Sequence, residues 1–314
     1  MPDILVVGSL NADLVARVPR FPQPGETISG DDLHIIPGGK GANQAVAAAR
    51  LGARVSMLGR VGKDNFGDFL LNNLKSNNVD SKLVQRDDAS TGTAIIAVDP
   101  NGQNIIVLSA GANGKVSSAD VDHASFPSGG LLLLQLEIPT PAVLRAAQRA
   151  SENGLRVILN PAPAQSIPDE LIALTDFIIP NETELSLLTD MEITDIESAE
   201  KAARVLLERG AQNVIVTLGN KGALIIDKDM SPSRASRDHG DARKHVDTYQ
   251  VNVVDTTAAG DAFIGGFTVA LLQDKSIENA TKYGCVCGAL ATTKFGAQPS
   301  LPAKTDVENF LAKL

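Results

Sequence analysis

The sequence predicts an α/β fold, with a largely parallel central sheet flanked by helices and a small β-sheet inserted as a lid. Two observations support the central sheet. Runs such as 4–7 and 131–134 are apolar without polar alternation, which is typical of strands buried on both faces of a parallel sheet. Helix-forming segments that end at glycines lie between such runs, as crossover units require. A third observation predicts the lid, because the segment 14–37 interrupts this rhythm with repeated Pro and Gly.

The composition is that of a globular protein and argues against several classes of function. Of the 314 residues, 43% are hydrophobic and 21% charged, and the net charge of −9 disfavours a nucleic-acid partner. Cys285 and Cys287 suit neither a disulfide nor a CxxC motif, so we expect free thiols in a reducing compartment. We find neither a signal peptide nor an apolar run of about eighteen residues, so we expect a cytoplasmic protein without a membrane partner.

The first third of the chain alternates strands and helices around the predicted lid. The first strand covers 4–8, and Asn11 and Asp13 follow it, either as turn residues or as a hydroxyl-binding pair. An alanine-rich helix, a strand and an amphipathic helix are expected at 44–52, 55–58 and from 64 onward. Strands at 93–98 and 104–108 flank Asp99-Pro100-Asn101-Gly102, which suits a type I turn.

This hairpin is expected to pair with the segment 14–37. The two pieces would form a small sheet whose edges and inner face must be covered by substrate or by a second subunit. The predicted domains are therefore a large α/β domain (1–13, 38–92 and 109–314) and a β lid for dimerisation (14–37 and 93–108).

The rest of the chain repeats the same crossover unit. Strands are predicted at 131–134, 157–160, 177–180, 214–218 and 223–226, and helices at 141–153 and 277–293. Gln135, Glu137, Asn160 and Asn181 each follow a strand, so we expect them to face one crevice at the carboxyl edge of the sheet. The polar segment 229–245 has no apolar period and is expected to be an exposed, mobile loop.

The stretch 38–43, GGKGAN, leads into the alanine-rich helix. Its spacing is not that of a Walker A loop, and three glycines before a helix are a weak signal alone. Lys40 and Asn43 are nevertheless candidate site residues, because they would lie at the N-terminal end of the helix. Asn11 and Asp13, which follow the first strand, would be close to them.

The stretch 255–261, DTTAAGD, precedes an apolar run and indicates a helix start that can hold an anion. The small side chains of Ala258, Ala259 and Gly260 leave their backbone N–H groups open. Asp261 would stand beside the anion, where a carboxylate is useful mainly as the base that accepts a proton from an attacking hydroxyl. A capped helix with small residues for close packing explains the same pattern equally well.

Two further segments are suited to binding a metal ion and a nucleotide. The stretch 181–184, NETE, begins a helix, where one acidic residue could cap the helix and another could hold hydrated Mg²⁺; capping is the commoner case. The tight loop 217–222 contains two glycines between two strands and could run its backbone along a nucleotide.

The joint order and spacing of these motifs resemble the PfkB carbohydrate kinases. The likeness runs from 8–13 (GSLNAD) to 296–300 (GAQPS) and includes 181–184 and 217–219. It implies a Rossmann-like domain that uses ATP, Mg²⁺ and a monovalent cation to phosphorylate a sugar hydroxyl, with Asp261 as the base. Independently of the resemblance, we expect a homodimer formed through the β lid, because the small sheet cannot bury both of its faces by itself.

The resemblance implies a role for each matching residue. The sugar would be held by Asn11, Asp13, Gly39, Lys40, Asn43 and Glu137, and the anion hole would consist of Ala258, Ala259 and Gly260. ATP would contact Asn181, Thr217, Leu218, Gly219, Asn220, Lys221, Gly222, Gly260 and Cys285, and Glu184 would act on Mg²⁺ through water. Potassium would be ligated by Asp255, Thr257 and oxygens of Ala291, Lys294, Gly296 and Ser300.

Two features depart from the family pattern. Cys285 stands where relatives often carry Asn or His beside the adenine, and the segment 229–245 is longer than the family needs.

Free D-ribose, phosphorylated at its 5-hydroxyl, is the expected substrate. The polar residues implied by the resemblance suit several hydroxyls, and nine Phe, two Tyr and no Trp leave little aromatic material to stack a base. The alternatives are another kinase of the family, acting on fructose, deoxyribose or a nucleoside, and a catalytically silent sugar-binding protein. A dinucleotide-binding oxidoreductase is disfavoured, because no G-x-G-x-x-G follows the first strand.

Overall fold

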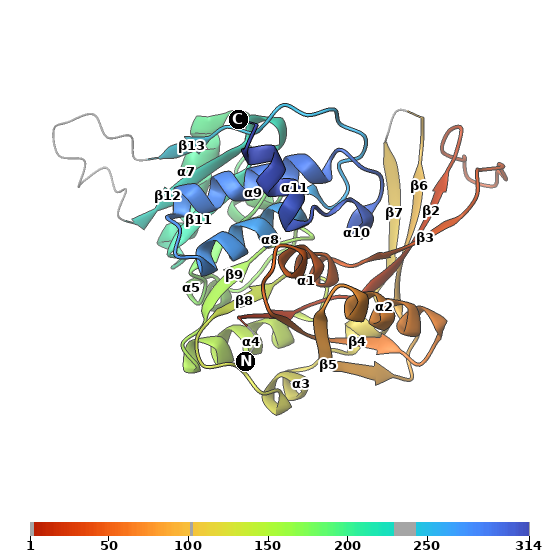
Figure 1. Cartoon of the computed structure of the whole chain (residues 1–314), viewed down its shortest axis with the longest axis horizontal. Coiled ribbons are helices and arrows are strands. Elements are labelled where there is room, and N and C mark those ends of the chain that lie inside the picture. The colour runs from red at the N-terminus through yellow and green to blue at the C-terminus, as the bar shows by residue number, and fades with distance from the viewer. Residues whose placement is uncertain (1–2, 101–102, 229–242, 314) are drawn as a thin grey trace.

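A nine-stranded sheet forms the body of the protein. The computed structural model describes residues 3–100, 103–228 and 243–313, and within them the strand order is β13-β12-β11-β10-β9-β8-β1-β4-β5 (Figure 1). Neighbouring strands from β11 to β5 are parallel, whereas β12 and β13 add an antiparallel edge. The bounds are β1 Ile4–Val7, β4 Val55–Gly62, β5 Val79–Asp87, β8 Leu131–Leu134, β9 Arg156–Leu159, β10 Phe177–Ile178, β11 Asn213–Thr217, β12 Ala223–Asp227 and β13 Lys244–Val246.

Helices cover both faces of this sheet. Along β1, Ile4 and Val6 pack into one layer of the core and Leu5 and Val7 into the other, because successive side chains of a strand point to opposite faces. The first layer contains α1 (Lys40–Arg50), α2 (Asn65–Ser76), α8 (Ala259–Leu272), α9 (Ile277–Ala291) and α11 (Lys304–Leu311), with α10 (Ala297–Ser300) between the last two. The second contains α3 (Ser118–His123), α4 (Thr140–Glu152), α5 (Asp169–Ala173), α6 (Glu182–Thr189) and α7 (Ile196–Glu208).

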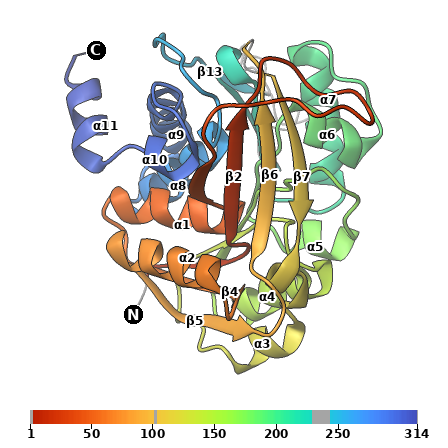
Figure 2. The same ribbon diagram turned by 90° about the vertical axis from the view of Figure 1, so that its right-hand side faces the viewer.

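A second, smaller sheet stands beside the body in Figure 1 and faces the viewer in Figure 2. Among the described residues its order is β3-β2-β6-β7, with bounds β2 Asn11–Arg17, β3 His34–Gly38, β6 Gly92–Val98 and β7 Asn104–Ser109. β2 and β6 are parallel, and β3 and β7 are antiparallel to them. The predicted pairing of the hairpin with the segment 14–37 is therefore confirmed, and so is the predicted fold class.

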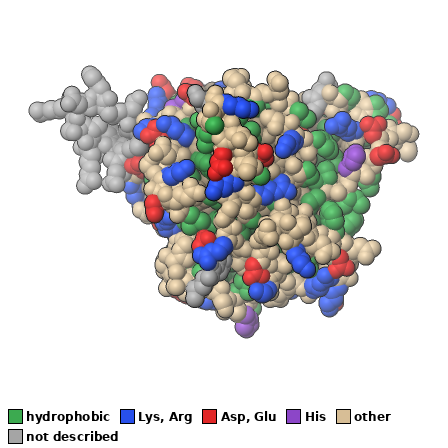
Figure 3. Space-filling view, in the orientation of Figure 1, with side chains coloured by type: hydrophobic (Ala, Val, Ile, Leu, Met, Phe, Trp, Pro, Cys, Tyr) green, Lys and Arg blue, Asp and Glu red, His purple; other side chains and the backbone are tan. Residues whose placement is uncertain are grey.

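The face of this small sheet that points away from the body is apolar and open. Ile35, Ile95, Ile105 and Val107 lie on it, each with about half of its surface exposed. Hydrophobic side chains gather over this part of the molecule in Figure 3. A sheet of this size cannot cover both of its own faces, and an open apolar patch usually marks a contact surface.

Three details differ from the sequence prediction. Helix α1 begins at Lys40 and not near 44, because Gly39 with its φ of 86° takes the N-cap position there. Asn11 and Asp13 lie within strand β2 and not in a loop after β1. Residues 244–245, expected in a mobile loop, belong to strand β13. Residues 229–242 of that segment and 101–102 of the predicted turn lie outside the described residues.

Strand β5 and helix α7 are absent from the sequence prediction. Charged residues interrupt the apolar pattern of β5, which is usual for a strand at the edge of a sheet. Within the described ranges, no helix is long and apolar enough to cross a membrane.

Candidate active site

Asp13 lines a cleft of about 1000 Å³ between the small sheet and the loop before α8. It lies two positions after Asn11 on β2, so both side chains leave the same face of the strand. The residue is only 8% exposed, and none of the described residues donates a hydrogen bond to its carboxylate. Donors for this carboxylate must therefore come from water or from a ligand.

The glycines of the stretch 38–43 allow chain segments to approach one another closely. A Cβ atom on Gly38 would lie 2.1 Å from Oδ2 of Asp13, and one on Gly41 would lie 2.6 Å from the backbone nitrogen of Ser9. The φ of 86° at Gly39 is a conformation that glycine adopts without strain. Close packing thus explains these glycines, and it places the start of α1 directly against β2.

Glu137 is held by the start of α1. Its Oε2 accepts the backbone N–H of Lys40 at 3.0 Å and also the hydroxyl of Ser9. The strand-end residue predicted after β8 and the lysine of the glycine-rich stretch are thereby brought together. Ser9, which is fully buried, is a member of this site that the sequence prediction did not include.

Asp261 lies buried in the first turn of α8. Its Oδ2 accepts a hydrogen bond from Nδ2 of Asn43 at 2.9 Å, and its Oδ1 accepts one from Nε2 of Gln44 at 3.0 Å. Helices α1 and α8 are close enough for these bonds because Gly265 faces Ala47, whose Cβ would be 2.5 Å from an added Cβ. Two donors therefore orient the carboxylate predicted to be the base.

The charges around the site perturb three pKa values. Burial raises the pKa of Asp261, although the nearby Lys40 and the two amide donors oppose that effect. Burial and repulsion from Glu137 and Asp261 raise the pKa of Asp13 to about 7. Burial lowers the pKa of Lys40, but the carboxylates of Asp261, Glu137 and Glu184 outweigh it and leave that pKa raised. A charged Lys40 beside Asp261 is suited to attract a phosphate.

Backbone N–H groups at the start of α8 offer an anion site. The N–H of Ala259 donates to the carbonyl of Thr256 at 3.2 Å, so one of the predicted donors already has a partner. In the described part of the chain the N–H of Gly260 has no acceptor, and a Cβ there would meet nothing within 4 Å. Ala258 adopts a left-handed φ of 59° that turns the chain into the helix. An open N–H at the positive end of α8 is suited to a phosphate oxygen.

Buried amide side chains connect the base to the strand ends. Nε2 of Gln135 donates to Oε1 of Gln44 at 2.6 Å, and Nε2 of Gln44 also reaches Oδ1 of Asn160 at 3.1 Å. Oδ1 of Asn43 is buried without a partner among the described residues. The sequence prediction missed Gln44. The sequence did contain a signal for it, the adjacent amide residues Asn43 and Gln44 in an alanine-rich helix, since such residues are seldom buried without a polar partner.

Asn181 and Glu184 form a capping box at the start of α6. Oδ1 of Asn181 accepts the N–H of Glu184 at 2.8 Å, and Oε2 of Glu184 accepts the N–H of Asn181 at 2.9 Å. Glu184 is buried, and burial raises its pKa. Capping, the commoner of the two interpretations, is observed, and the role of Glu184 toward Mg²⁺ stays a prediction.

The predicted nucleotide loop joins β11 to β12. An isolated bridge pairs Thr217 with Asn181, so these two predicted ATP contacts are neighbours. Gly219 leaves open space where a Cβ would be, whereas a Cβ on Gly222 would lie 2.0 Å from the carbonyl oxygen of Val246. Cys285 is buried in α9, and burial raises the pKa of its thiol to about 12, so it offers a neutral surface.

Asp255 joins the loop before α8 to the loop after α9. Its Oδ2 accepts the N–H of Gly296 at 2.8 Å, and its Oδ1 accepts the N–H of Thr257 at 2.9 Å. Its own N–H donates to the carbonyl of Thr292 at 3.2 Å. Three of the predicted potassium ligands, Asp255, Thr257 and Gly296, are therefore close together. Gly296 belongs to the same segment as the other three predicted ligands, Ala291, Lys294 and Ser300. The cation itself stays a prediction.

A buried carboxylate in the first turn of α8, oriented by two amide donors and close to a lysine, fits an enzyme that phosphorylates a small alcohol. The chain belongs to the pfkB family of carbohydrate kinases, whose profile matches residues 1–304. The resemblance of the motifs to this family is thereby confirmed.

Several relatives within the family are similar to this chain over their whole length. The chain is 43% identical to ribokinase of Haemophilus influenzae, with 98% of each chain covered, and 38% identical to deoxyribokinase of Salmonella typhi, with 99% of each covered. It is also similar to the structure of Arabidopsis thaliana ribokinase in complex with ribose and ATP, at a TM-score of 0.87, 33% identity and coverage of 99% and 98% of the two chains.

Proposed function

We propose that this protein is a ribokinase, which transfers the γ-phosphoryl group of ATP to the 5-hydroxyl of D-ribose and releases ribose 5-phosphate and ADP. The observation that carries the proposal is a pair of hydrogen-bond acceptors, Asp13 and Asn43, that lack donors in the described part of the chain, near the junction of the small sheet and α1. Asp13 accepts no hydrogen bond from the described residues, and Oδ1 of Asn43 has no partner among them. Unpaired buried groups are costly, and the hydroxyls of a small sugar would pair them. The similarity to ribokinases of two organisms supports the same conclusion.

The sugar is held at the junction of the small sheet and α1. Its hydroxyls face the side chains of Asn11, Asp13, Lys40, Asn43 and Glu137 and the backbone of Gly39. The hydrogen bonds that place Glu137 against Lys40 and Asn43 against Asp261 support this arrangement, because they orient the polar atoms before a sugar binds.

Asp261 is the base of the reaction. It takes the proton of the 5-hydroxyl while that oxygen forms a bond to the γ-phosphorus, and the bond from this phosphorus to the leaving ADP oxygen breaks. The N–H groups of Ala258 and Gly260 and the charge of Lys40 stabilise the transferred group, joined by the N–H of Ala259 when it leaves the Thr256 carbonyl. The open N–H of Gly260 and the raised pKa of Asp261 support these roles.

The nucleotide binds along the carboxyl ends of β10 and β11, against Asn181, the loop 217–222, Gly260 and Cys285. The bridge between Asn181 and Thr217 and the open space at Gly219 support this position. When bound, ATP supplies the phosphoryl group and Mg²⁺ neutralises its phosphate oxygens. Glu184 holds the Mg²⁺ through water, which fits a carboxylate whose oxygens already accept hydrogen bonds from Asn181.

A monovalent cation, potassium, activates the enzyme from the loop beside the anion hole. The fit rests on Asp255, whose carboxylate accepts the N–H groups of Thr257 and Gly296 and so brings residues with carboxylate, hydroxyl and carbonyl oxygens close together. Hard cations of this kind prefer such oxygen ligands. The remaining ligands are oxygens of Ala291, Lys294 and Ser300.

Two copies associate through the open face of the small sheet. The lid and dimerisation domain consists of 14–37 and 93–108, and the remaining segments 1–13, 38–92 and 109–314 form the nucleotide- and sugar-binding domain. The exposed apolar residues of β3, β6 and β7 support this contact. The buried free thiols Cys285 and Cys287 support a location in the cytoplasm.

The test compares kcat/KM for ribose, 2-deoxyribose, fructose and adenosine at saturating ATP and potassium. Ribose should give the highest value. 2-Deoxyribose is the second candidate, because the similarity to a deoxyribokinase covers 99% of the chain. A higher value for deoxyribose, fructose or adenosine would move the assignment to the corresponding kinase, and no phosphorylation of any of them would refute a sugar kinase.

A further inference from the structure

Asn113 contacts the first residues of the small sheet from outside it. It lies in the short helix η1 (Gly111–Lys115), which follows β7, and is 1% exposed. Its Oδ1 accepts the backbone N–H of Leu10 at 2.9 Å, and its Nδ2 donates to the carbonyl of Leu10 at 3.0 Å. The same Nδ2 donates to Oδ1 of Asn11 at 2.7 Å. The side chain of Asn113 therefore uses both ends of its amide inside the protein.

These bonds determine which end of the Asn11 amide faces the cleft. The N–H of Leu10 can only donate, so it must meet the oxygen of Asn113. The nitrogen of Asn113 then faces Asn11 and can pair only with the oxygen of that amide. Asn11 is left with its N–H₂ group for the cleft, whereas Asn43 presents an oxygen, since its own nitrogen donates to Asp261.

Asn113 also lies where the strands of the small sheet join the body. β2 and β6 begin side by side, with Asn11 opposite Gly92. A Cβ on Gly92 would lie 2.2 Å from Nδ2 of Asn113 and 2.4 Å from Oδ1 of Asn11, so Gly92 is pressed against the bond between the two side chains. η1 begins two residues after β7 ends at Ser109. The side chain of Asn113 thus lies against the first residues of β2 and β6.

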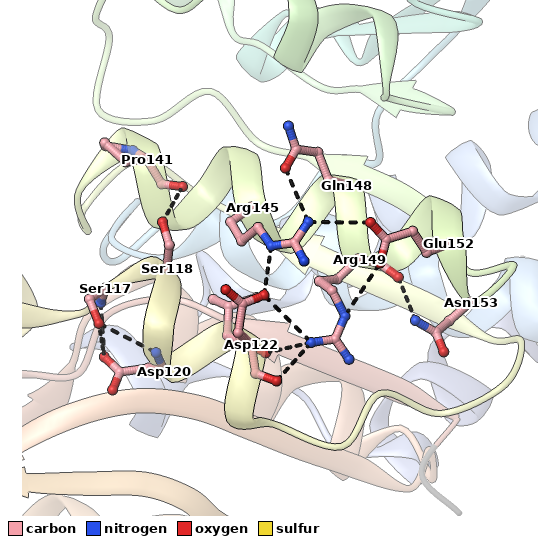
Figure 4. A network of polar contacts seen from close by, with 11 residues as sticks. Ser117, Ser118, Asp120, Asp122, Pro141, Arg145, Gln148, Arg149, Glu152 and Asn153 are labelled. Atoms are coloured by element: carbon pink, nitrogen blue, oxygen red, sulfur yellow. Dashed lines mark hydrogen bonds and ion pairs between the residues drawn. The ribbon is translucent and has the colours of Figure 1, made fainter.

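The segment that follows Asn113 is anchored to the body. Figure 4 shows how α3, which follows η1, is tied to α4: Arg145 bonds to the carboxylate of Asp122 at 2.7 Å, and Arg149 bonds to the Asp122 carbonyl at 2.9 Å. Arg60 of β4 also pairs with Asp120 of α3, at 2.9 Å and 2.7 Å. Asn113, five residues before α3, therefore lies next to a segment that is bonded to the body.

We propose that Asn113 is a positioning residue for the sugar site. It orients Asn11 so that the amide N–H₂ donates to a sugar hydroxyl, and it holds the first residues of β2 against the body. The proposal rests on the proposed sugar kinase function, because it assigns the group that Asn11 offers to the sugar.

The first test replaces Asn113 with Asp, which has almost the same shape. The new carboxylate can still accept the N–H of Leu10, but it has no hydrogen for the carbonyl of Leu10 or for Oδ1 of Asn11. The amide of Asn11 then has to turn over and present its oxygen to the cleft. We expect the KM and the calorimetric Kd for ribose to rise about tenfold, the usual effect of one hydrogen bond. The kcat should stay within about threefold and the KM for ATP should not change.

A second variant changes neither amide. Gly92→Ala puts a methyl group into the bond between Asn113 and Asn11 and should raise the KM for ribose in the same way. Gly114→Ala is the matched control on the same turn, because its Cβ would meet only the Cβ of Ala110 at 3.4 Å, an ordinary contact. It should keep wild-type kinetics. Thermal unfolding of each variant checks that it is folded, and Asn113→Ser replaces Asn113→Asp if the latter does not fold.

A double-mutant cycle distinguishes positioning from general damage. In an Asn11→Ala background, Asn113→Asp should change ribose affinity less than about twofold, because the group that it orients is already gone. An equal loss of affinity in both backgrounds, an unchanged affinity in the native background, or a fall in kcat alone would overturn the role of Asn113. Ribose affinity by calorimetry reports on Asn113 without turnover, whereas failure of the wild-type enzyme to phosphorylate any sugar would refute the proposed function instead.

Discussion

Replacing Asp13 with Asn should stabilise the protein above neutral pH while weakening sugar binding. Burial and repulsion from Glu137 and Asp261 raise the pKa of Asp13 from 3.8 to about 7. Each unit of difference between these two pKa values corresponds to about 1.4 kcal/mol. Ionised Asp13 therefore lowers the free energy of unfolding by ~4 kcal/mol. Water in the open cleft reduces that cost, so we expect the free energy of unfolding at pH 8 to rise by about 2 kcal/mol in the variant.

The pH dependence of this gain has a definite sign. The folded pKa of Asp13 lies above the unfolded value, so the wild-type protein takes up a proton on folding between about pH 4 and pH 7 and gains stability as the pH falls. Asn cannot take up this proton. The difference between variant and wild type should be largest at pH 8, shrink below pH 7 and vanish near pH 4.

The assay is urea unfolding of both proteins at pH 5, 6, 7 and 8, since other titrating groups cancel in the difference. Asp32→Asn, at an exposed position between β2 and β3, is the control and should change stability by less than about 0.5 kcal/mol at every pH. Calorimetry should show at least a tenfold weaker affinity of Asp13→Asn for ribose, roughly the loss of one charged hydrogen bond. Equal unfolding free energies at all four pH values, or a less stable variant at pH 8, would refute the reasoning.

Three further predictions follow from the site and the lid. Asp261→Asn should keep ribose affinity within several-fold but lose roughly two to four orders of magnitude in kcat, because the amide cannot accept the hydroxyl proton; retention of more than a tenth of wild-type turnover would contradict its role as base. After thorough dialysis, activity should be higher in potassium than in tetramethylammonium, since Asp255 and Gly296 join the cation loop to the start of α8; equal rates would remove the proposed cation. Light scattering at micromolar concentration should show a dimer, and Ile95→Glu, which charges the exposed face of β6, should give a monomer of unchanged fold; a monomeric wild-type protein would disprove the proposed contact.

Much of the fold could be predicted because the strands of a parallel sheet covered on both faces are continuous apolar runs in the sequence. Leu131–Leu134 matches β8 residue for residue, since every side chain of that strand is buried. β5 is not a continuous apolar run, because a strand at the edge of the sheet tolerates Lys82, Gln85 and Arg86. The start of α1 was placed too late, since the residues before Gln44 contain the glycines that pack against β2.

The sequence by itself determined the two layers of the body, the small sheet and the residue types of the site. Asp261, the residues around Lys40 and those on β2 belong to local motifs whose pattern can be read in order along the chain. Only the tertiary structure decided how these side chains are oriented. The bond from Gln44 to Asp261 joins residues 217 positions apart, and the bond from Asn113 to Asn11 joins residues 102 apart. Such pairs arise from the packing of α1 on α8 and of η1 on β2, and an amide's choice of donor or acceptor depends on the partner that packing supplies.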